Sequence, residues 1–375
     1  EVVAEDFGIP KYIMRNISNI TGNSWSVAQP VNEKFPVLIF SHGHGGLKIQ
    51  NTTQMEEMAS HGYVVFACDH AYDAGVSIFP GERIIFSKTD IPEGFTEEEK
   101  WDLRRVQLDY RVADIQFMLD EMTRDNFLSV ALKNSLDLDH IGVFGHSFGG
   151  GTSVVVASTD ERIDACFGLD TWFLPVPSSV LNSDLNKPFI HLGQVRWKEE
   201  DNYLKLDTLV GNNSAWSLRL YVQGATHYDF TDFSQFNRLT KRFGSGEIAA
   251  PRIRRITNSA IRDFFDHYLK NGPALAAETY EKVYPEVIVK QYRIIFYCGF
   301  RDYTDNRVSG RRGAVNSQYT SRKGACSLRQ YHPKNFFCIP VGRANSIRVG
   351  GFIAYQDHQR SRSRRLPGGA ECAFL

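Results

Sequence analysis

Apolar runs rich in β-forming residues alternate with helical segments across residues 35–290, and this alternation restricts the chain to a small set of folds. The runs at 35–43 and 63–70 predict buried strands, and the segment between them, 52–62, has helical spacing and ends at Gly62. Strands connected through helices form βαβ units, which build a mostly parallel sheet covered by helices on both faces. We therefore expect an α/β fold. The other predicted elements are strands at 140–147, 163–170, 188–193 and 217–224, and helices at 97–122, 149–158 and 251–271.

The ionisable residues divide the chain into two parts. The 375 residues include 43 Lys plus Arg and 43 Asp plus Glu, so the formal net charge is zero. Residues 291–375 hold 15 basic and 4 acidic side chains, whereas residues 1–290 hold 28 basic and 39 acidic ones. An acidic first part excludes a uniformly basic nucleic-acid-binding protein there. The pattern predicts a lead-in at 1–30, an α/β catalytic domain at 31–290 and a basic, irregular, poorly ordered extension at 291–375.

Cysteine positions and the lengths of apolar runs bear on metal binding, membrane insertion and location. Cys68 and Cys166 lie in strand-like runs, which is typical of small buried hydrophobic residues. No uncharged apolar run reaches the roughly 18 residues of a transmembrane helix. The chain begins at Glu1 and no apolar signal segment follows, so cytoplasmic and secreted locations both stay open. The remaining cysteines lack the CxxC spacing of a zinc site, and their pairing stays open; they are Cys298, Cys326, Cys338 and Cys372.

The sequence GHSFGG at 145–150 contains the pattern G-x-S-x-G with Ser147 at its centre. It follows a predicted strand and precedes a predicted helix, which is the context of a nucleophile elbow. In such an elbow the serine sits on a sharp turn with strained backbone angles, and side chains two positions away would collide. Gly145 and Gly149 remove those side chains. The pattern therefore indicates Ser147 as a nucleophile.

A nucleophilic serine needs a base. His227 follows the last predicted parallel strand in a loop and comes after both the serine and a candidate acid, which is the chain order Ser, Asp/Glu, His of α/β-hydrolases. His70 and His191 lie on or after strands and remain possible. His146 is given no role, because its side chain is expected to point away from the serine. His227 is the predicted base.

The third member of the set is an acid that orients the histidine. Asp170 ends an apolar strand directly after the predicted nucleophile helix, where a buried carboxylate without a partner would be costly. Glu199, Glu200 and Asp201 follow the next strand and form the alternative, although such a cluster is more typical of a solvated helix start. We favour Asp170.

The transition state of acyl transfer needs two backbone N–H groups aimed at the developing oxyanion. One is predicted to come from Phe148, the residue after the nucleophile. The other is predicted to come from the glycine-rich loop SHGHGG at 41–46, through the main chain of His44.

These stretches together resemble the plasma-type (isoform II) platelet-activating factor acetylhydrolase family, a dienelactone-hydrolase-like branch of the α/β-hydrolases. The resemblance covers roughly residues 30–270. It implies an α/β-hydrolase fold, Ser147 as nucleophile, Asp170 as acid, His227 as base, and the main-chain N–H groups of His44 and Phe148 as the oxyanion hole. Family members cleave short or oxidised sn-2 acyl chains from phospholipids without calcium. The motifs are FPVLIFSHGHGG (35–46), ASHGYVVFACDH (59–70), GVFGHSFGGGT (142–152), LDTWFLP (169–175) and GATHYDFTDF (224–233).

Two further stretches are expected to shape the substrate pocket. Trp172 and Phe173 follow Asp170 directly and are predicted to form its wall, next to Phe148. The loop at 71–96 is long for its position, as lids and binding loops tend to be.

The expected activity is that of a serine carboxylic-ester hydrolase for short acyl chains, including short-chain sn-2 phospholipid esters, without metal or cofactor. The alternatives are a cutinase-like or general carboxylesterase and a non-catalytic ligand-binding protein on the same scaffold. The basic extension stays open between an electrostatic anchor and a segment without function. The oligomeric state also stays open.

Overall fold

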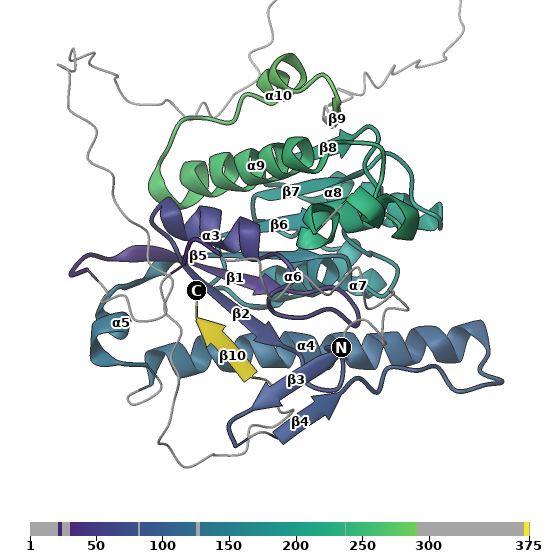
Figure 1. Cartoon of the computed structure of the whole chain (residues 1–375), viewed down its shortest axis with the longest axis horizontal. Coiled ribbons are helices and arrows are strands. Elements are labelled where there is room, and N and C mark those ends of the chain that lie inside the picture. Colours follow the sequence, from purple (N-terminus) through teal and green to yellow (C-terminus); the bar gives the residue numbers. More distant parts are fainter. Residues whose placement is uncertain are drawn as a thin grey trace, which may run out of the picture. The chain divides into compact units, whose positions relative to one another are not determined.

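The computed structural model describes residues 22–24, 31–81, 83–124, 128–236, 238–290 and 371–374 (Figure 1). All of them belong to one compact unit. Most of the basic extension, with Cys298, Cys326 and Cys338, lies outside these residues; Cys372 is described only as part of a strand at 371–374, so the structure does not address the pairing of these cysteines or the predictions for the rest of the extension. The same holds for most of the lead-in at 1–30.

An eight-stranded sheet in the order β10-β2-β1-β5-β6-β7-β8-β9 forms the centre of this unit (Figure 1). The six strands from β2 to β8 in that order are parallel, and the strands at the two edges pair antiparallel. The mostly parallel α/β-hydrolase sheet expected from the sequence is confirmed. The strands are β1 (Phe35–Ser41), β2 (Val64–Asp69), β5 (Leu136–His146), β6 (Ala165–Leu169), β7 (Phe189–Gln194), β8 (Ser217–Val222), β9 (Val287–Lys290) and β10 (Glu371–Phe374).

Helices bury both faces of the sheet because successive side chains of each strand point to opposite sides. In β1, Val37 and Ile39 pack on one hydrophobic core, and Leu38 and Phe40 pack on the other. The first core is closed by α4 (Glu97–Thr123), α6 (Phe148–Thr159), α7 (Ser178–Leu181) and α8 (Asp201–Asn212). The second is closed by α3 (Thr52–Ser60), α9 (Ala250–Lys270) and α10 (Ala277–Val283).

Local sequence signals fix the ends of the longest helices. At α4, the Thr96 side chain accepts from the Glu99 N–H while the Glu99 side chain accepts from the Thr96 N–H, a capping box that satisfies two backbone donors. At α9, Pro251 lies in the first turn, where its missing N–H is harmless, and Asn271 ends the helix in the left-handed region at φ 54°.

The long loop at 71–96 contains a hairpin of β3 (Val76–Phe79) and β4 (Arg83–Phe86). The remaining short elements are α5 (Val130–Asn134), η2 (His227–Phe230), η3 (Asp232–Gln235) and η4 (Arg238–Phe243). None of the helices in the described part of the chain combines the length and apolar character needed to cross a bilayer.

Candidate active site

Ser147 sits on a tight turn between the end of β5 and the start of α6. Its φ of 55° and ψ of −117° are strained for a residue with a side chain, as an elbow requires. A Cβ on Gly145 would lie 2.3 Å from the Gly149 carbonyl oxygen, and a Cβ on Gly149 would lie 2.0 Å from the Ser41 carbonyl oxygen. The steric reason for glycine at these positions therefore holds in the folded chain.

His227 and Asp170 meet at the carboxyl edge of the sheet, although 57 residues separate them. His227 begins η2 after β8, and its Nδ1 lies 2.6 Å from Oδ2 of Asp170, which directly follows β6. The Asp170 side chain is fully buried, while that of His227 is 28% exposed. The backbone of Asp170 is left-handed at φ 38°, which turns the chain sharply after the strand.

The Asp170 carboxylate has donors on both oxygens. Oδ1 accepts from the Gln194 N–H at 2.9 Å and the Trp197 indole N–H at 3.2 Å, and Oδ2 accepts from the Gln194 amide at 2.8 Å as well as from His227. Burial opposes ionisation, but the His227 hydrogen bond and charge and the Gln194 N–H outweigh it, so the pKa of Asp170 is lowered. An ionised carboxylate only accepts, so His227 carries its proton on Nδ1 and leaves Nε2 as an acceptor.

A cavity of about 530 Å³ lies at this edge of the sheet, and Ser147 and His227 both line it. The rest of the lining is mostly apolar. The aromatic side chains that contribute to it are Trp172, Trp197, Tyr228, Phe233, Phe236 and Phe243.

Two backbone N–H groups are candidates for binding a ligand: that of His44 in the cavity wall and that of Phe148, which directly follows Ser147 but is buried and not itself among the lining residues. Phe148 is the first residue of α6, whose initial N–H groups have no partner inside the helix. Among the described residues, the N–H groups of Phe148 and His44 have no hydrogen-bond acceptor. Both residues are those predicted to form an oxyanion hole.

The His44 side chain forms part of the cavity wall. Its ring packs against Phe148 and Trp172, with centroids 6.1 Å and 6.4 Å away, and its Nε2 lies 2.9 Å from a guanidinium nitrogen of Arg104. Burial, aided by the charges of Arg104 and Arg111, lowers the pKa of His44 to about 4. The ring is therefore neutral at pH 7, with Nε2 accepting from Arg104.

Two expectations for the pocket differ from what is found. Trp172 lines the cavity, but Phe173 does not: its side chain is fully buried, with its ring 5.6 Å from the His191 ring. Adjacent residues in an irregular segment point to different sides, so only one of the two reaches the cavity. No residue of the loop 71–96 contributes to the lining of this cavity.

The other candidate bases and acids lie elsewhere. His70 is buried between Ser41 and Asp114, at 2.9 Å and 3.0 Å, away from the cavity lining. His191 is buried inside β7. Of the alternative acidic cluster, Glu199 lies at the cavity, while the carboxylate bonded to His227 is that of Asp170.

Sequence reasoning missed His146, which faces the cavity and does not turn away from it. Its Nδ1 accepts from the Gln50 amide at 2.7 Å, its Nε2 donates to the His227 carbonyl at 3.0 Å, and its ring lies 4.5 Å from the His227 ring. The Gln50 carbonyl in turn accepts from the Gly43 N–H at 3.1 Å. This chain of contacts connects the glycine-rich loop to the loop of His227.

The Asp170 partners Gln194 and Trp197 were also missed. Gln194 ends β7 and Trp197 follows it; β7 lies next to β6, the strand that Asp170 follows, and this adjacency is the signal that could have indicated them. The aromatic residues just after His227 were a local sequence signal for the cavity lining, since four of the rings that line the cavity lie between residues 228 and 243.

Several known proteins are similar to this chain in sequence. The chain is 27% identical over 241 residues to platelet-activating factor acetylhydrolase of Gallus gallus, an alignment that covers 58% of this chain and 55% of that protein. It is 24% identical over 288 residues to a probable 1-alkyl-2-acetylglycerophosphocholine esterase of Arthroderma benhamiae, covering 68% of this chain and 66% of that protein. The chain thus spans about half the length of the vertebrate relatives it matches.

A solved structure, the ferulic acid esterase from Streptomyces cinnamoneus, superposes with a TM-score of 0.60 at 28% identity, covering 70% of this chain and 76% of that one. Residues 16–271 match the family described as platelet-activating factor acetylhydrolase, isoform II. That match covers more than half of the chain, which therefore belongs to the platelet-activating factor acetylhydrolase isoform II family.

Proposed function

We propose that this chain is a serine carboxylic-ester hydrolase with Ser147 as nucleophile, His227 as base and Asp170 as the orienting acid. The observation that carries the proposal is the 2.6 Å contact between His227 Nδ1 and the buried Asp170 carboxylate, beside a cavity that Ser147 also lines. Membership of an acetylhydrolase family and the likeness to an esterase structure support it.

In the first half of the reaction, His227 Nε2 accepts the proton of Ser147 Oγ as that oxygen attacks the ester carbonyl carbon. The ionised Asp170 stabilises the imidazolium that results. The carbonyl oxygen becomes an oxyanion and accepts from the N–H groups of His44 and Phe148, which have no acceptor among the described residues.

Collapse of the tetrahedral intermediate breaks the bond to the leaving alkoxide, which takes the proton from His227 and departs as the alcohol. Water then gives its proton to His227 and attacks the acyl group on Ser147. A second tetrahedral intermediate releases the carboxylic acid and restores the serine.

The cavity supports esters with a short acyl group. Its volume of about 530 Å³ lies in the range of small-molecule sites, and its apolar lining suits an uncharged acyl chain. The substrate class we propose is therefore short-chain acyl esters, including the sn-2 acetyl ester of an alkyl-acetyl-glycerophosphocholine. The second class is aromatic or polyester substrates, favoured by the six aromatic side chains at the cavity. Similarity to a Thermobifida alba cutinase, 25% over 162 residues, supports this second class.

Turnover of p-nitrophenyl acetate tests the proposal. We expect Ser147→Ala to lower kcat by on the order of 10³-fold or more, because the nucleophile is removed while binding remains. Unchanged turnover would refute the assignment of Ser147. A panel of acyl chain lengths, with an sn-2 acetyl phospholipid and an aromatic polyester among the substrates, separates the two substrate classes.

The competing function is a ligand-binding protein without catalysis. A fluorophosphonate probe distinguishes it, since stoichiometric labelling of Ser147 requires an activated serine.

We place the catalytic domain within residues 31–290. Esterase activity that survives removal of residues 291–375 is the expected result for that boundary.

A further inference from the structure

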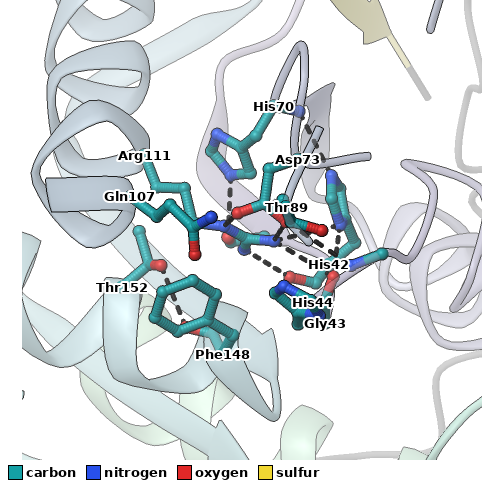
Figure 2. A network of polar contacts seen from close by, with 12 residues as sticks. His42, Gly43, His44, His70, Asp73, Thr89, Gln107, Arg111, Phe148 and Thr152 are labelled. Atoms are coloured by element: carbon teal, nitrogen blue, oxygen red, sulfur yellow. Dashed lines mark hydrogen bonds and ion pairs between the residues drawn. The ribbon is translucent and has the colours of Figure 1, made fainter. Parts of the chain in front are cut away.

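Arg111 of α4 is a buried cation that bonds both Asp73 and the loop that carries His44 (Figure 2). Its side chain is 1% exposed. Nε and one terminal nitrogen donate to the two carboxylate oxygens of Asp73 at 2.7 Å and 2.8 Å. The terminal nitrogens also donate to the His42 carbonyl at 2.7 Å and to the Gly43 carbonyl at 3.1 Å.

The Gly43 carbonyl is held from three sides. Besides Arg111, it accepts from the Gly46 N–H at 2.9 Å and from His42 Nδ1 at 2.6 Å. His42 Nε2 accepts from the backbone N–H of His70 at 3.1 Å, so the His42 ring must carry its proton on Nδ1. Burial and the Arg111 charge lower the pKa of His42, which keeps it in this neutral form.

The consequence lies at the other end of the same peptide unit. In a trans peptide the C=O and N–H bonds point in opposite directions within one plane. The carbonyl of the Gly43–His44 peptide is directed toward Arg111 and His42, so the N–H of His44 is directed the other way. Gly43 and His44 both line the cavity, and this N–H has no acceptor among the described residues.

The same guanidinium contacts the second predicted donor. The Cζ of Arg111 lies 4.6 Å from the centre of the Phe148 ring, a cation–π contact, and Phe148 supplies the other available N–H (Figure 2). Donors on a carbonyl also polarise the peptide and strengthen its N–H as a donor. Arg111 thus bonds the carbonyl of the peptide whose N–H belongs to His44, and it contacts the ring of Phe148.

Stability alone does not account for this buried pair. Replacing a buried ion pair by apolar side chains of similar size is often neutral or stabilising, because the desolvation of both charges is avoided. Asp73 is 6% exposed, and although burial disfavours its charge, Arg111 holds the pKa of its carboxyl well below the usual range. A guanidinium can bond two carbonyls and a carboxylate together in one plane, which neither an apolar side chain nor an ammonium can do.

We propose that Arg111, held by Asp73, is a positioning residue that orients and polarises the Gly43–His44 peptide so that its N–H serves as an oxyanion donor. This inference rests on the proposed esterase function. Arg111 does not line the cavity and acts through the loop, so its removal is expected to affect the transition state more than substrate binding.

The test compares Arg111→Met, Arg111→Lys and Asp73→Asn with wild type in the full chain. We expect kcat for p-nitrophenyl acetate to fall about 100-fold in Arg111→Met, as for loss of an oxyanion donor, with KM changed less than 3-fold. Arg111→Lys keeps the charge without the planar fork and is expected to lose about 10-fold. Asp73→Asn keeps the guanidinium on the carbonyls and is expected to lose less than Arg111→Met.

An aryl trifluoromethyl ketone gives a readout that a purely structural role would not change. Ser147 Oγ adds to its carbonyl carbon, the C=O electron pair moves onto oxygen, and His227 takes the serine proton, so the adduct presents an oxyanion. The inhibition constant should rise in proportion to the loss in kcat/KM across the variants. Arg162→Gln is the matched control, since it breaks an Arg–Asp pair, 2.6 Å to Asp160, whose residues do not line the cavity.

The outcomes separate two failures. If the wild-type chain neither hydrolyses the ester nor binds the ketone, the esterase function itself is refuted. If the wild type is active and kcat of both Arg111→Met and Arg111→Lys stays within 3-fold of the wild-type value, the positioning role is overturned, whatever the melting temperatures of the variants. If Arg111→Met does not fold, the same two measurements on Arg111→Lys decide the question. A variant whose kcat falls while its inhibition constant for the ketone stays unchanged also overturns the proposal.

Discussion

Asp170→Asn is the substitution whose effect the site geometry defines most sharply. The new side chain has one oxygen and one NH₂ group, and two orientations are open to it. If the NH₂ replaced Oδ1, it would face the Gln194 backbone N–H and the Trp197 indole N–H, which can only donate. If it replaced Oδ2, it would face the Gln194 amide, which can turn over, and His227 Nδ1, which can change tautomer. The second orientation is therefore favoured.

That orientation inactivates the base. Nδ1 of His227 accepts from the asparagine, so the proton moves to Nε2, and Nε2 no longer accepts the proton of Ser147. From the wrong tautomer and the lost stabilisation of the imidazolium, we expect kcat to fall 10³–10⁴-fold, about 4–5 kcal/mol in activation free energy. All four contacts remain as hydrogen bonds, but neutral ones, so the unfolding free energy should fall by only about 1–3 kcal/mol.

Steady-state hydrolysis of p-nitrophenyl acetate and urea denaturation of the same preparation measure the two effects. Glu200→Gln and Asp201→Asn are the matched controls, since they remove exposed carboxylates of the alternative acidic cluster that do not line the cavity. We expect these controls to keep kcat within about 3-fold, the range of a surface charge change. The reasoning is refuted if Asp170→Asn keeps a tenth of the wild-type kcat, or if either control loses as much as Asp170→Asn.

Three further changes have defined outcomes. Trp197→Phe removes one donor from Asp170 and should lower kcat about 3–10-fold with little change in melting temperature, measured by the same assay and a thermal melt. Gly149→Ala should abolish soluble or active protein, because its Cβ would lie 2.0 Å from a carbonyl oxygen of β1; a fully active variant contradicts the elbow geometry. Burial lowers the pKa of His146 to about 3 and that of His191 to about 4, so below pH 6.5 the unfolded chain binds more protons at these sites than the native one. Each of the two histidines should therefore lower the unfolding free energy by about 1.4 kcal/mol per pH unit as the pH falls from about 6 to 4.5. In denaturation experiments, the unfolding free energy of His191→Phe should depend on pH less steeply than that of the wild type, by that amount.

Much of the fold follows from local patterns in the sequence. Apolar runs and helical spacing gave every strand from β1 to β8 in the main sheet and the helices α3, α4, α6 and α9, with boundaries within a few residues, because hydrophobic periodicity and capping act over short stretches. The short elements α5, α7, α10 and β9 were missed, since segments of 4 to 7 residues carry little periodic signal. The 12-residue α8 was missed although its apolar residues follow helical spacing.

For the candidate site, the sequence by itself determined the elbow around Ser147 and the order of serine, acid and histidine. Glycine spacing reports a steric need within five residues, and parallel strands bring their carboxyl ends to one edge whatever the loops contain. Those two local facts placed Ser147, Asp170 and His227 at the same edge.

Only the tertiary structure decided which polar side chains meet there. Arg111 and the His42 carbonyl are 69 residues apart, and Gln50 and His146 are 96 apart, so no local pattern relates them. Trp172 reaches the cavity and its neighbour Phe173 does not, because an irregular segment has no periodicity to assign a side. Hydrogen bonds between distant side chains depend on the closed fold and the resulting rotamers, which is why the support of the loop that carries His44 became visible only in three dimensions.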